Sequence, residues 1–343
     1  MILLSACMSC MVLIADAKAP FIAYRPVLDA RFGRDVVNDE AVTPALRKDS
    51  EFVSLPAIAP LDPAASGLAA PALADGLVRP VRGNKLLLTN GVTTVEGSSG
   101  GGLARWATIA GRQTGRGVGL SAHVTAIELP DFGWRSYGAA LGIGDRIEVT
   151  IARADFDTRD AGAALGIGQG YTFNLDTYGA KLRIAGDLVY GAAWMPQIAL
   201  GIEHKRSRDG ALVRALGAAH DSGTDITLSA TKLLLARSLL ANATLRYTKA
   251  NELGLLGFGS GAADHALQFE GSLGYQLSRR MVVGAEYRNK PDNLGLGEDD
   301  WVDLFAAYAL TDHLTMTAAY VDLGAVATFS GQRGGFVSAQ VAF

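Results

Sequence analysis

The sequence predicts an all-β protein, a transmembrane antiparallel up-and-down β-barrel of about fourteen strands, with roughly 12–16 as the range. Segments of alternating apolar and polar residues repeat from Asn84 onward, and most prolines lie ahead of that point. Of the 343 residues, 49% are hydrophobic and only 19% are charged. Because alternate side chains of a strand point to opposite faces, this pattern suits a wall with lipid outside and small or polar side chains inside.

The last strand is the clearest single case. One of its faces is polar or small at Ser338, Gln340 and Ala342, and the chain then ends on an aromatic residue. We expect the opposite face to contact outer-membrane lipid and the strand to be the signal that the barrel-assembly machinery recognises. That face carries Val337, Ala339, Val341 and Phe343.

Residues 1–19 are expected to be a signal peptide, because an apolar run is followed by alanines at alternate positions, Ala15, Ala17 and Ala19. A transmembrane helix is the other interpretation, but it needs about 20 apolar residues. Both cysteines, Cys7 and Cys10, lie in this run, so the mature chain is expected to contain none. We therefore expect export through the periplasm to the cell outer membrane.

Residues 20–82 hold eight of the 11 prolines. Proline lacks the donor that a central strand requires, so this stretch is expected to be an extended or disordered periplasmic segment. A plug folded into the lumen is the other interpretation, but the segment has no apolar periodicity that would favour it. The barrel is expected to occupy residues 83–343.

Alternation is most regular around residues 267–277, where Leu267, Phe269, Leu273 and Tyr275 share one face. Each segment alone is a weak signal, and the repetition carries the prediction. The expected strands cover residues 85–96, 103–112, 117–128, 133–143, 146–156, 171–185, 194–206, 224–234, 238–249, 265–276, 280–290, 300–310, 313–324 and 333–343.

The connections alternate in length, as they do in bacterial barrels with short periplasmic turns and longer extracellular loops. Short turns are expected at 144–145, 235–238, 278–279 and 311–312, and longer loops at 157–170, 206–223, 251–264, 290–299 and 324–332. Tyrosines near strand ends predict an aromatic girdle at the membrane interface. These are Tyr137, Tyr178, Tyr247, Tyr275, Tyr287, Tyr308 and Tyr320.

Charged residues on the polar faces are expected to point into the lumen, since they cannot face lipid. In a narrow barrel they would pair and seal the lumen, whereas in a wider one they would line a pore. Both signs occur, so no strong ion preference is predicted, and the net charge of −3 gives no reason to expect nucleic acid. The candidates are Lys181, Arg183, Glu203, Lys205, Arg246, Glu270, Glu286, Arg288 and Asp303.

No catalytic residue, cofactor or metal site is predicted. The five histidines show no ligand spacing, and the glycines at 97–102 lack the lysine and helix of a phosphate-binding loop. Ser229 or Ser272 paired with His204 or His265 would be needed for a hydrolase in the barrel wall, and one sequence cannot show that they are adjacent.

From about Gly83 to Phe343 the chain resembles an uncharacterised family of Gram-negative outer-membrane proteins, catalogued as a domain of unknown function. The resemblance implies a secreted barrel and carries over no substrate or catalytic residue. It is carried by NKLLLTNGVTTVEG at 84–97, GAALGIGQGYTF at 162–173, LVRALGA at 212–218, SATKLLLA at 229–236, KANELGLLGFG at 249–259, VGAEYRNKPDNLG at 283–295 and AAYVDLG at 318–324.

The expected function is passive passage or porin-like binding of a small solute of unknown identity. About fourteen strands enclose more lumen than the eight that side chains can fill. A structural or adhesive barrel with a closed lumen is the first alternative, and a lipid-modifying enzyme in the wall is the second. Leucine and phenylalanine in a long loop suggest an apolar solute as a variant, at Leu253, Leu255, Leu256 and Phe258.

Overall fold

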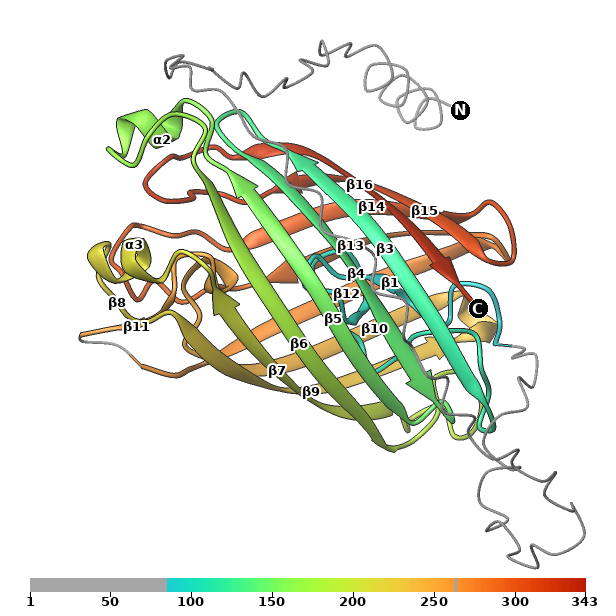
Figure 1. The fold of residues 1–343 in the computed structure, drawn as a ribbon. Coiled ribbons are helices and arrows are strands. Elements are labelled where there is room, and N and C mark those ends of the chain that lie inside the picture. Colours follow the sequence, from blue (N-terminus) through green and yellow to red (C-terminus); the bar gives the residue numbers. More distant parts are fainter. Residues whose placement is uncertain (1–84, 262–263) are drawn as a thin grey trace, which may run out of the picture. The chain divides into compact units, whose positions relative to one another are not determined.

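The computed structural model describes residues 85–261 and 264–343. Its main element is a closed antiparallel barrel of 12 strands, in which neighbours in sequence are neighbours in space (Figure 1). Pairing of β16 with β3 closes the wall. The strands are β3 (Val118–Glu128), β4 (Gly133–Ile143), β5 (Ile147–Asp157), β6 (Thr172–Ala185), β7 (Gln197–Ser207), β9 (Ser222–Leu234), β10 (Leu239–Thr248), β12 (Ala266–Ser278), β13 (Met281–Arg288), β14 (Trp301–Ala309), β15 (Leu314–Asp322) and β16 (Arg333–Ala342).

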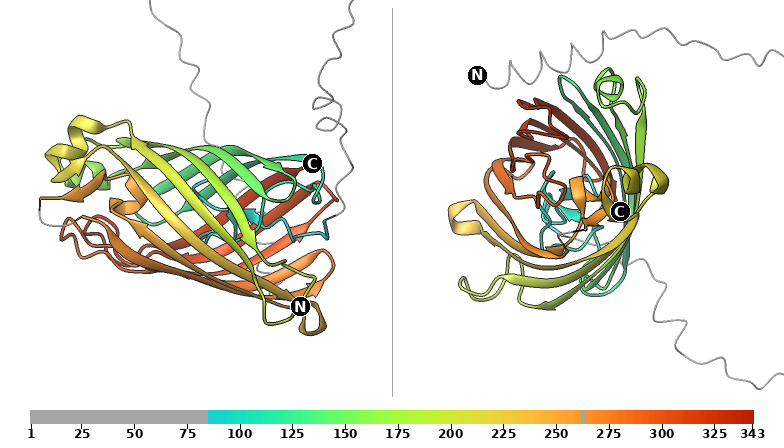
Figure 2. Two further views of the ribbon diagram at one scale, coloured as in Figure 1. Left: turned by 90° about the horizontal axis from the view of Figure 1, so that it is seen from below. Right: turned by 90° about the vertical axis from the view of Figure 1, so that its left-hand side faces the viewer.

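Twelve strands are two fewer than the expected fourteen and lie at the lower limit of the expected range. The ranges 85–96 and 103–112 are not part of the wall. The first contains only the short β1 (Val92–Thr93), which pairs with the short β2 (Ser99–Gly100) between the two ranges, and the second contains no strand. Every residue from 89 to 111 is buried, and Figure 2 shows this segment inside the barrel. We call residues 85–116 the plug. Protein surrounds residues 89–111, so the alternation in this part of the plug does not mark a lipid face. The expected signal peptide and proline-rich segment lie outside the described residues.

The long loops lie at one end of the barrel and most short turns at the other, as predicted. The long loops carry α2 (Ala161–Ala164), α3 (Gly210–Ala215), η2 (Asn251–Gly254) and the pair β8 (Ala218–His220) and β11 (Phe258–Ser260). At the other end, the turn between β9 and β10 contains η1 (Leu235–Arg237). Two connections break the pattern, because 129–132 is short at the long-loop end and 186–196 is long at the other. No helix in the described part of the chain is long and apolar enough to cross a membrane.

The outer surface of the wall carries an apolar belt. All seven tyrosines expected in the girdle are exposed, together with leucine, isoleucine and valine side chains of the same strand faces. On three strands, a charged residue lies two positions nearer the long-loop end than a girdle tyrosine. The pairs are Tyr137 with Arg135, Tyr178 with Asp176 and Tyr320 with Asp322. The belt therefore ends at these tyrosines, and the strands continue beyond it.

Candidate functional site: the plug and the inner wall

Arg105 of the plug is the centre of a buried network of charges. Its guanidinium bonds to Glu203 Oε1 of β7 at 2.8 Å and to Glu270 Oε1 of β12 at 2.6 Å. Its Nη2 also lies 2.7 Å from Glu96 Oε2 of the plug. The side chain is 1% exposed. Buried charges are expensive unless paired. Arg105 is paired with carboxylates of the plug and of two wall strands, β7 and β12, which are separated by β9 and β10.

The rest of the network comes from neighbouring strands. Lys205 Nζ of β7 contacts Glu96 and lies 2.6 Å from Asp225 Oδ2 of β9. Arg288 Nη1 of β13 lies 2.5 Å from Glu96 Oε2, and Arg246 Nε of β10 lies 3.0 Å from Glu270 Oε1. Acidic and basic groups are equal in number within this set, so the network is electrically balanced.

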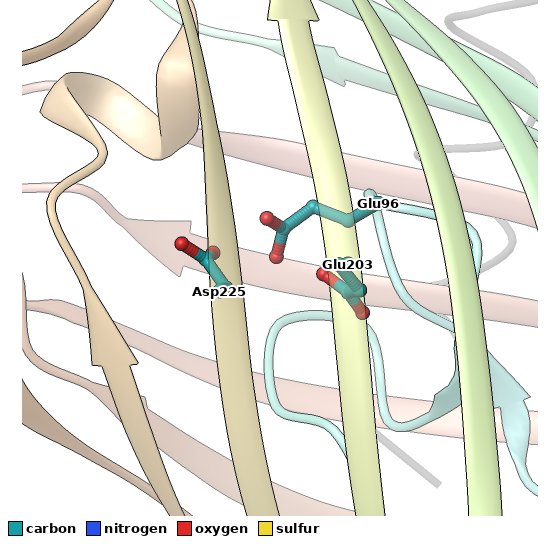
Figure 3. Close-up of side chains that lie close together, drawn as sticks. All are labelled: Glu96, Glu203 and Asp225. Carbon is teal, nitrogen blue, oxygen red and sulfur yellow. The ribbon is translucent and has the colours of Figure 1, made fainter.

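Three carboxylates of the network, Glu96, Glu203 and Asp225, converge closely enough to suggest a metal site (Figure 3). The chain's own cations already hold these oxygens, because Lys205 contacts all three carboxylates and Arg105 contacts two of them. A metal ion would have to displace a lysine and an arginine from the same point. The geometry therefore describes an ion-pair network rather than a metal centre.

Hydrogen bonds around the barrel hold the backbone of the plug. Glu148 of β5 accepts from Ser99 N at 3.1 Å and from Ala110 N at 2.7 Å. Lys181 of β6 donates to Ser99 O at 2.9 Å. On the other side, Glu286 of β13 accepts from Leu103 N at 2.7 Å. Wall side chains thus make the hydrogen bonds to the plug backbone that a neighbouring strand would make in a sheet.

The structure places all nine candidate charged residues on the inner face of the wall. It brings Glu203, Lys205, Arg246, Glu270 and Arg288 into the network around Arg105. Lys181 pairs with Glu148, and Asp303 Oδ1 accepts from Glu286 N at 3.1 Å.

Arg183 lies apart from the network, because it is near the short-turn end and its Nη1 is 3.0 Å from Asp145 Oδ2.

Sequence reasoning missed Glu96, Arg105, Glu148 and Asp225. Asp225 and Glu148 could have been found from the sequence, since each lies on the polar face of an expected strand.

The serine–histidine pairs considered from the sequence are not formed. Ser229 and Ser272 face the lumen, where they bond to Thr244 and Glu286. His204 is exposed on the outside and bonds to Thr224, and His265 stacks on Tyr247. Another pair, His123 Nε2 and Ser136 Oγ, is buried in the lumen at 3.5 Å. No carboxylate in the described ranges bonds to that ring, so the third group of a hydrolase triad is missing.

Above the plug, toward the long loops, the lumen is filled by an apolar cluster that we call the apolar cap. It includes plug residues Val95 and Leu103, aromatic side chains of the wall such as Trp134 and Trp301, and Phe258 from a loop. The lumen is therefore closed twice, by the charged plug at mid-height and by the apolar cap at the long-loop end.

The apolar cap encloses a cavity of about 90 Å³ beneath the long loops, which we call the cap cavity. Its polar side chains are Thr158 and Glu252. All the others are apolar, among them Phe132, Phe156, Phe173, Leu255, Leu256 and Leu294.

A sequence profile of the family described as "Protein of unknown function (DUF3034)" matches residues 89–340. The chain belongs to this family. The match begins inside the plug and ends in β16, so it covers most of the plug together with the barrel. No curated protein matches the sequence.

Several solved barrels are similar in fold. The KdgM porin matches with a TM-score of 0.43 and 9% identity, over 65% of this chain and 99% of that one. The NanC porin matches with 0.41 and 9%, over 65% and 98%. The outer membrane phospholipase A from Escherichia coli matches with 0.34 and 10%, over 66% and 91%. At these values the likeness does not extend to function.

Proposed function

We propose that the protein is an outer-membrane channel for a small solute, closed at rest by its own plug. The apolar belt with its tyrosines supports the membrane location, because the apolar side chains suit the hydrocarbon and the tyrosines suit the interface between lipid and water. The alternation of long loops and short turns supports the same placement.

The polarity of the wall behind the plug carries the proposal. Without Glu96 and Arg105, the wall still presents Glu203, Asp225 and Glu270 together with Lys205, Arg246 and Arg288. Replacing buried ion pairs by well-packed apolar residues is often neutral or stabilising. A permanently closed barrel therefore has no need of this lining, whereas a lumen that fills with water when the plug moves does.

The attachment of the plug also supports movement. Apart from β1 and β2, the plug has no regular strand, and side-chain hydrogen bonds and ion pairs join it to the wall. Such contacts are individually replaceable by water once the lumen is wet. The alternative of a structural barrel shares the closed lumen but requires that the plug never leaves.

A reversible disulfide between plug and wall tests the proposal. The backbone N of Ala107 donates to Thr231 Oγ1 of β9 at 2.7 Å, so Ala107→Cys with Thr231→Cys introduces two cysteines at neighbouring positions of plug and wall. In planar bilayers we expect brief openings of the native protein, their loss in the oxidised variant and their return on reduction. Ala107→Cys alone is the control.

Liposome swelling in arabinose provides a second readout. The native protein should admit the sugar slowly, and the oxidised variant should not. If the native protein and the Arg105→Met variant both fail to conduct and to swell liposomes, the structural barrel replaces the channel.

A further inference from the structure

We propose that the cap cavity is the outer binding site of this protein for a small, uncharged, aromatic molecule. The inference rests on the proposed function for its role in passage, but binding at the cap cavity can be tested without passage.

The lining selects for apolar ligands. Three phenyl rings and several leucines form it, and Phe132 stacks on Phe156 with ring centroids 5.0 Å apart. Aromatic ligands gain edge-to-face and offset contacts in such a site beyond the area they bury. A cavity lined by leucine, isoleucine and phenylalanine stays dry and takes up apolar molecules.

The two polar side chains of the lining are already bonded. Thr158 Oγ1 donates to Tyr171 O at 2.8 Å, and Glu252 Oε1 accepts from Lys290 Nζ at 2.6 Å. A charged ligand would lose its water and find no free counter-charge, which is a large cost. The lining therefore discriminates against ions and favours an uncharged molecule.

Two unpaired donors lie deeper in the apolar cap. Trp134 Nε1 and Trp301 Nε1 have no hydrogen-bond partner within the described part of the chain, although both side chains are buried. Trp134 packs edge-on against Phe156, which lines the cap cavity, and against Trp301. An unsatisfied buried donor costs about 1–3 kcal/mol, but neither indole lines the cap cavity, so the choice of ligand rests on the apolar lining alone.

The cap cavity lies beyond the lipid belt. Phe173 and Phe156 are each five residues nearer the long-loop end than Tyr178 and its strand partner Ile151, which belong to the belt. Five long loops line the cap cavity, contributing Leu165 and Ile167, Leu216, Leu255 and Leu256, Leu294 and Leu296, and Val326 and Ala327. A solute therefore enters from outside the membrane when these loops separate.

The size sets the expected ligand. A cavity of about 150 Å³ accommodates benzene. The cap cavity, at about 90 Å³, therefore takes a single ring only if the surrounding loops move slightly apart. Toluene is a suitable probe because it is one uncharged ring. Benzoate, of similar size but negatively charged, is the matched ligand that should fail.

The experiment uses the full chain in detergent and measures toluene by saturation-transfer NMR. We expect saturable binding to the native protein and at least tenfold weaker binding of benzoate. Leu256→Trp places a larger side chain in the cap cavity and should weaken toluene binding at least tenfold. Leu304→Trp is the control, because Leu304 is 66% exposed on the lipid face of β14 and should leave binding within about twofold.

Ile167→Phe fills the same cap cavity from another loop and protects the test against misfolding of Leu256→Trp. Toluene binding that does not saturate, or that both filling variants leave unchanged, overturns the site. If toluene binds as expected while the channel experiments fail, the site stands and the proposed passage falls. If the channel conducts but toluene does not bind, the proposed passage stands and the binding site falls.

Discussion

At the scale of single residues, Arg105 of the plug supplies one of the four cations that balance the four buried carboxylates of the network. Glu203 and Asp225 are opposite each other in β7 and β9, a like-charge arrangement that is unfavourable between strands. Lys205 and Arg105 relieve it by contacting these carboxylates. Arg105 therefore fixes the plug and also stabilises the wall around it.

Arg105→Met should release the plug, because it keeps the length of the side chain and leaves Glu96, Glu203 and Glu270 without their shared cation. Breaking a buried pair on one side costs about 3–5 kcal/mol. We expect amide hydrogen exchange to accelerate across residues 89–111 and openings in bilayers to become more frequent. Arg116→Met changes an exposed arginine of the same segment and should do neither. Unchanged exchange in the plug would show that Arg105 does not hold it.

A second residue-scale feature is a cluster in the long loops, outside the wall. Lys290 Nζ lies 2.6 Å from Glu252 Oε1 and 2.7 Å from Glu298 Oε2, and Glu298 also accepts from Ala327 N at 3.0 Å. Burial, followed by the hydrogen bond and charge of Glu252, raises the pKa of Glu298 to about 8. The cluster joins three of the five loops that line the cap cavity.

These loops should loosen as pH rises from about 5 to about 8. In that range the folded loops bind a proton at Glu298 that the unfolded chain has already released, so deprotonation works against the folded form. Toluene should therefore enter the cap cavity faster at pH 9 than at pH 6. Glu298→Gln, which stays neutral, should remove most of this dependence, and a pH profile identical to the native one would assign the effect to another group.

At the scale of elements, the plug differs from the strands around it because it is shaped by close contact with the wall. Gly97 lies in the turn between β1 and β2 with φ of +94°, and a Cβ there would be 2.6 Å from the Cβ of Ala152 in β5. A residue with a side chain is strained in that backbone conformation. Gly97 thus lets the plug approach the wall closely.

Gly97→Ala should displace the plug without changing any charge. Both the backbone strain and the collision with Ala152 oppose docking, so trypsin should cleave the plug faster and bilayer openings should increase. Gly115→Ala is the matched control, because nothing lies within 4 Å of a Cβ there and its φ is not positive. Equal protease resistance in both variants would contradict a close fit at Gly97.

Sequence periodicity predicts the wall elements well and the plug poorly. The range 117–128 corresponds to β3, and 265–276 to most of β12, because lipid on one side enforces a strict period of two. Inside the lumen both faces of a segment are buried, so 85–96 carries no such constraint. Arg105 and Glu270 are 165 residues apart in sequence, and no local pattern can indicate that they meet.

At the scale of the whole molecule, the proposed outer-membrane placement divides the barrel at the belt into a part in lipid and a part that projects outward. Three girdle tyrosines mark the border, and the outward positions beyond them carry charge, as at Arg135 and Asp176. Charge is expensive in hydrocarbon. The cap cavity and the long loops therefore belong to the projecting part, while the plug network lies at the height of the belt.

Cysteine labelling on intact cells tests this division, since the expected mature chain contains no other cysteine. An impermeant maleimide should label Arg135→Cys, which lies beyond Tyr137 on the outside of β4. It should not label Leu141→Cys, which lies on the same face within the belt and is shielded by lipid. Arg279→Cys, in a short turn, should react only after the outer membrane is permeabilised. Labelling of Arg279→Cys in intact cells would invert the orientation and turn the cap cavity toward the periplasm, whereas labelling of Leu141→Cys would remove the lipid belt itself.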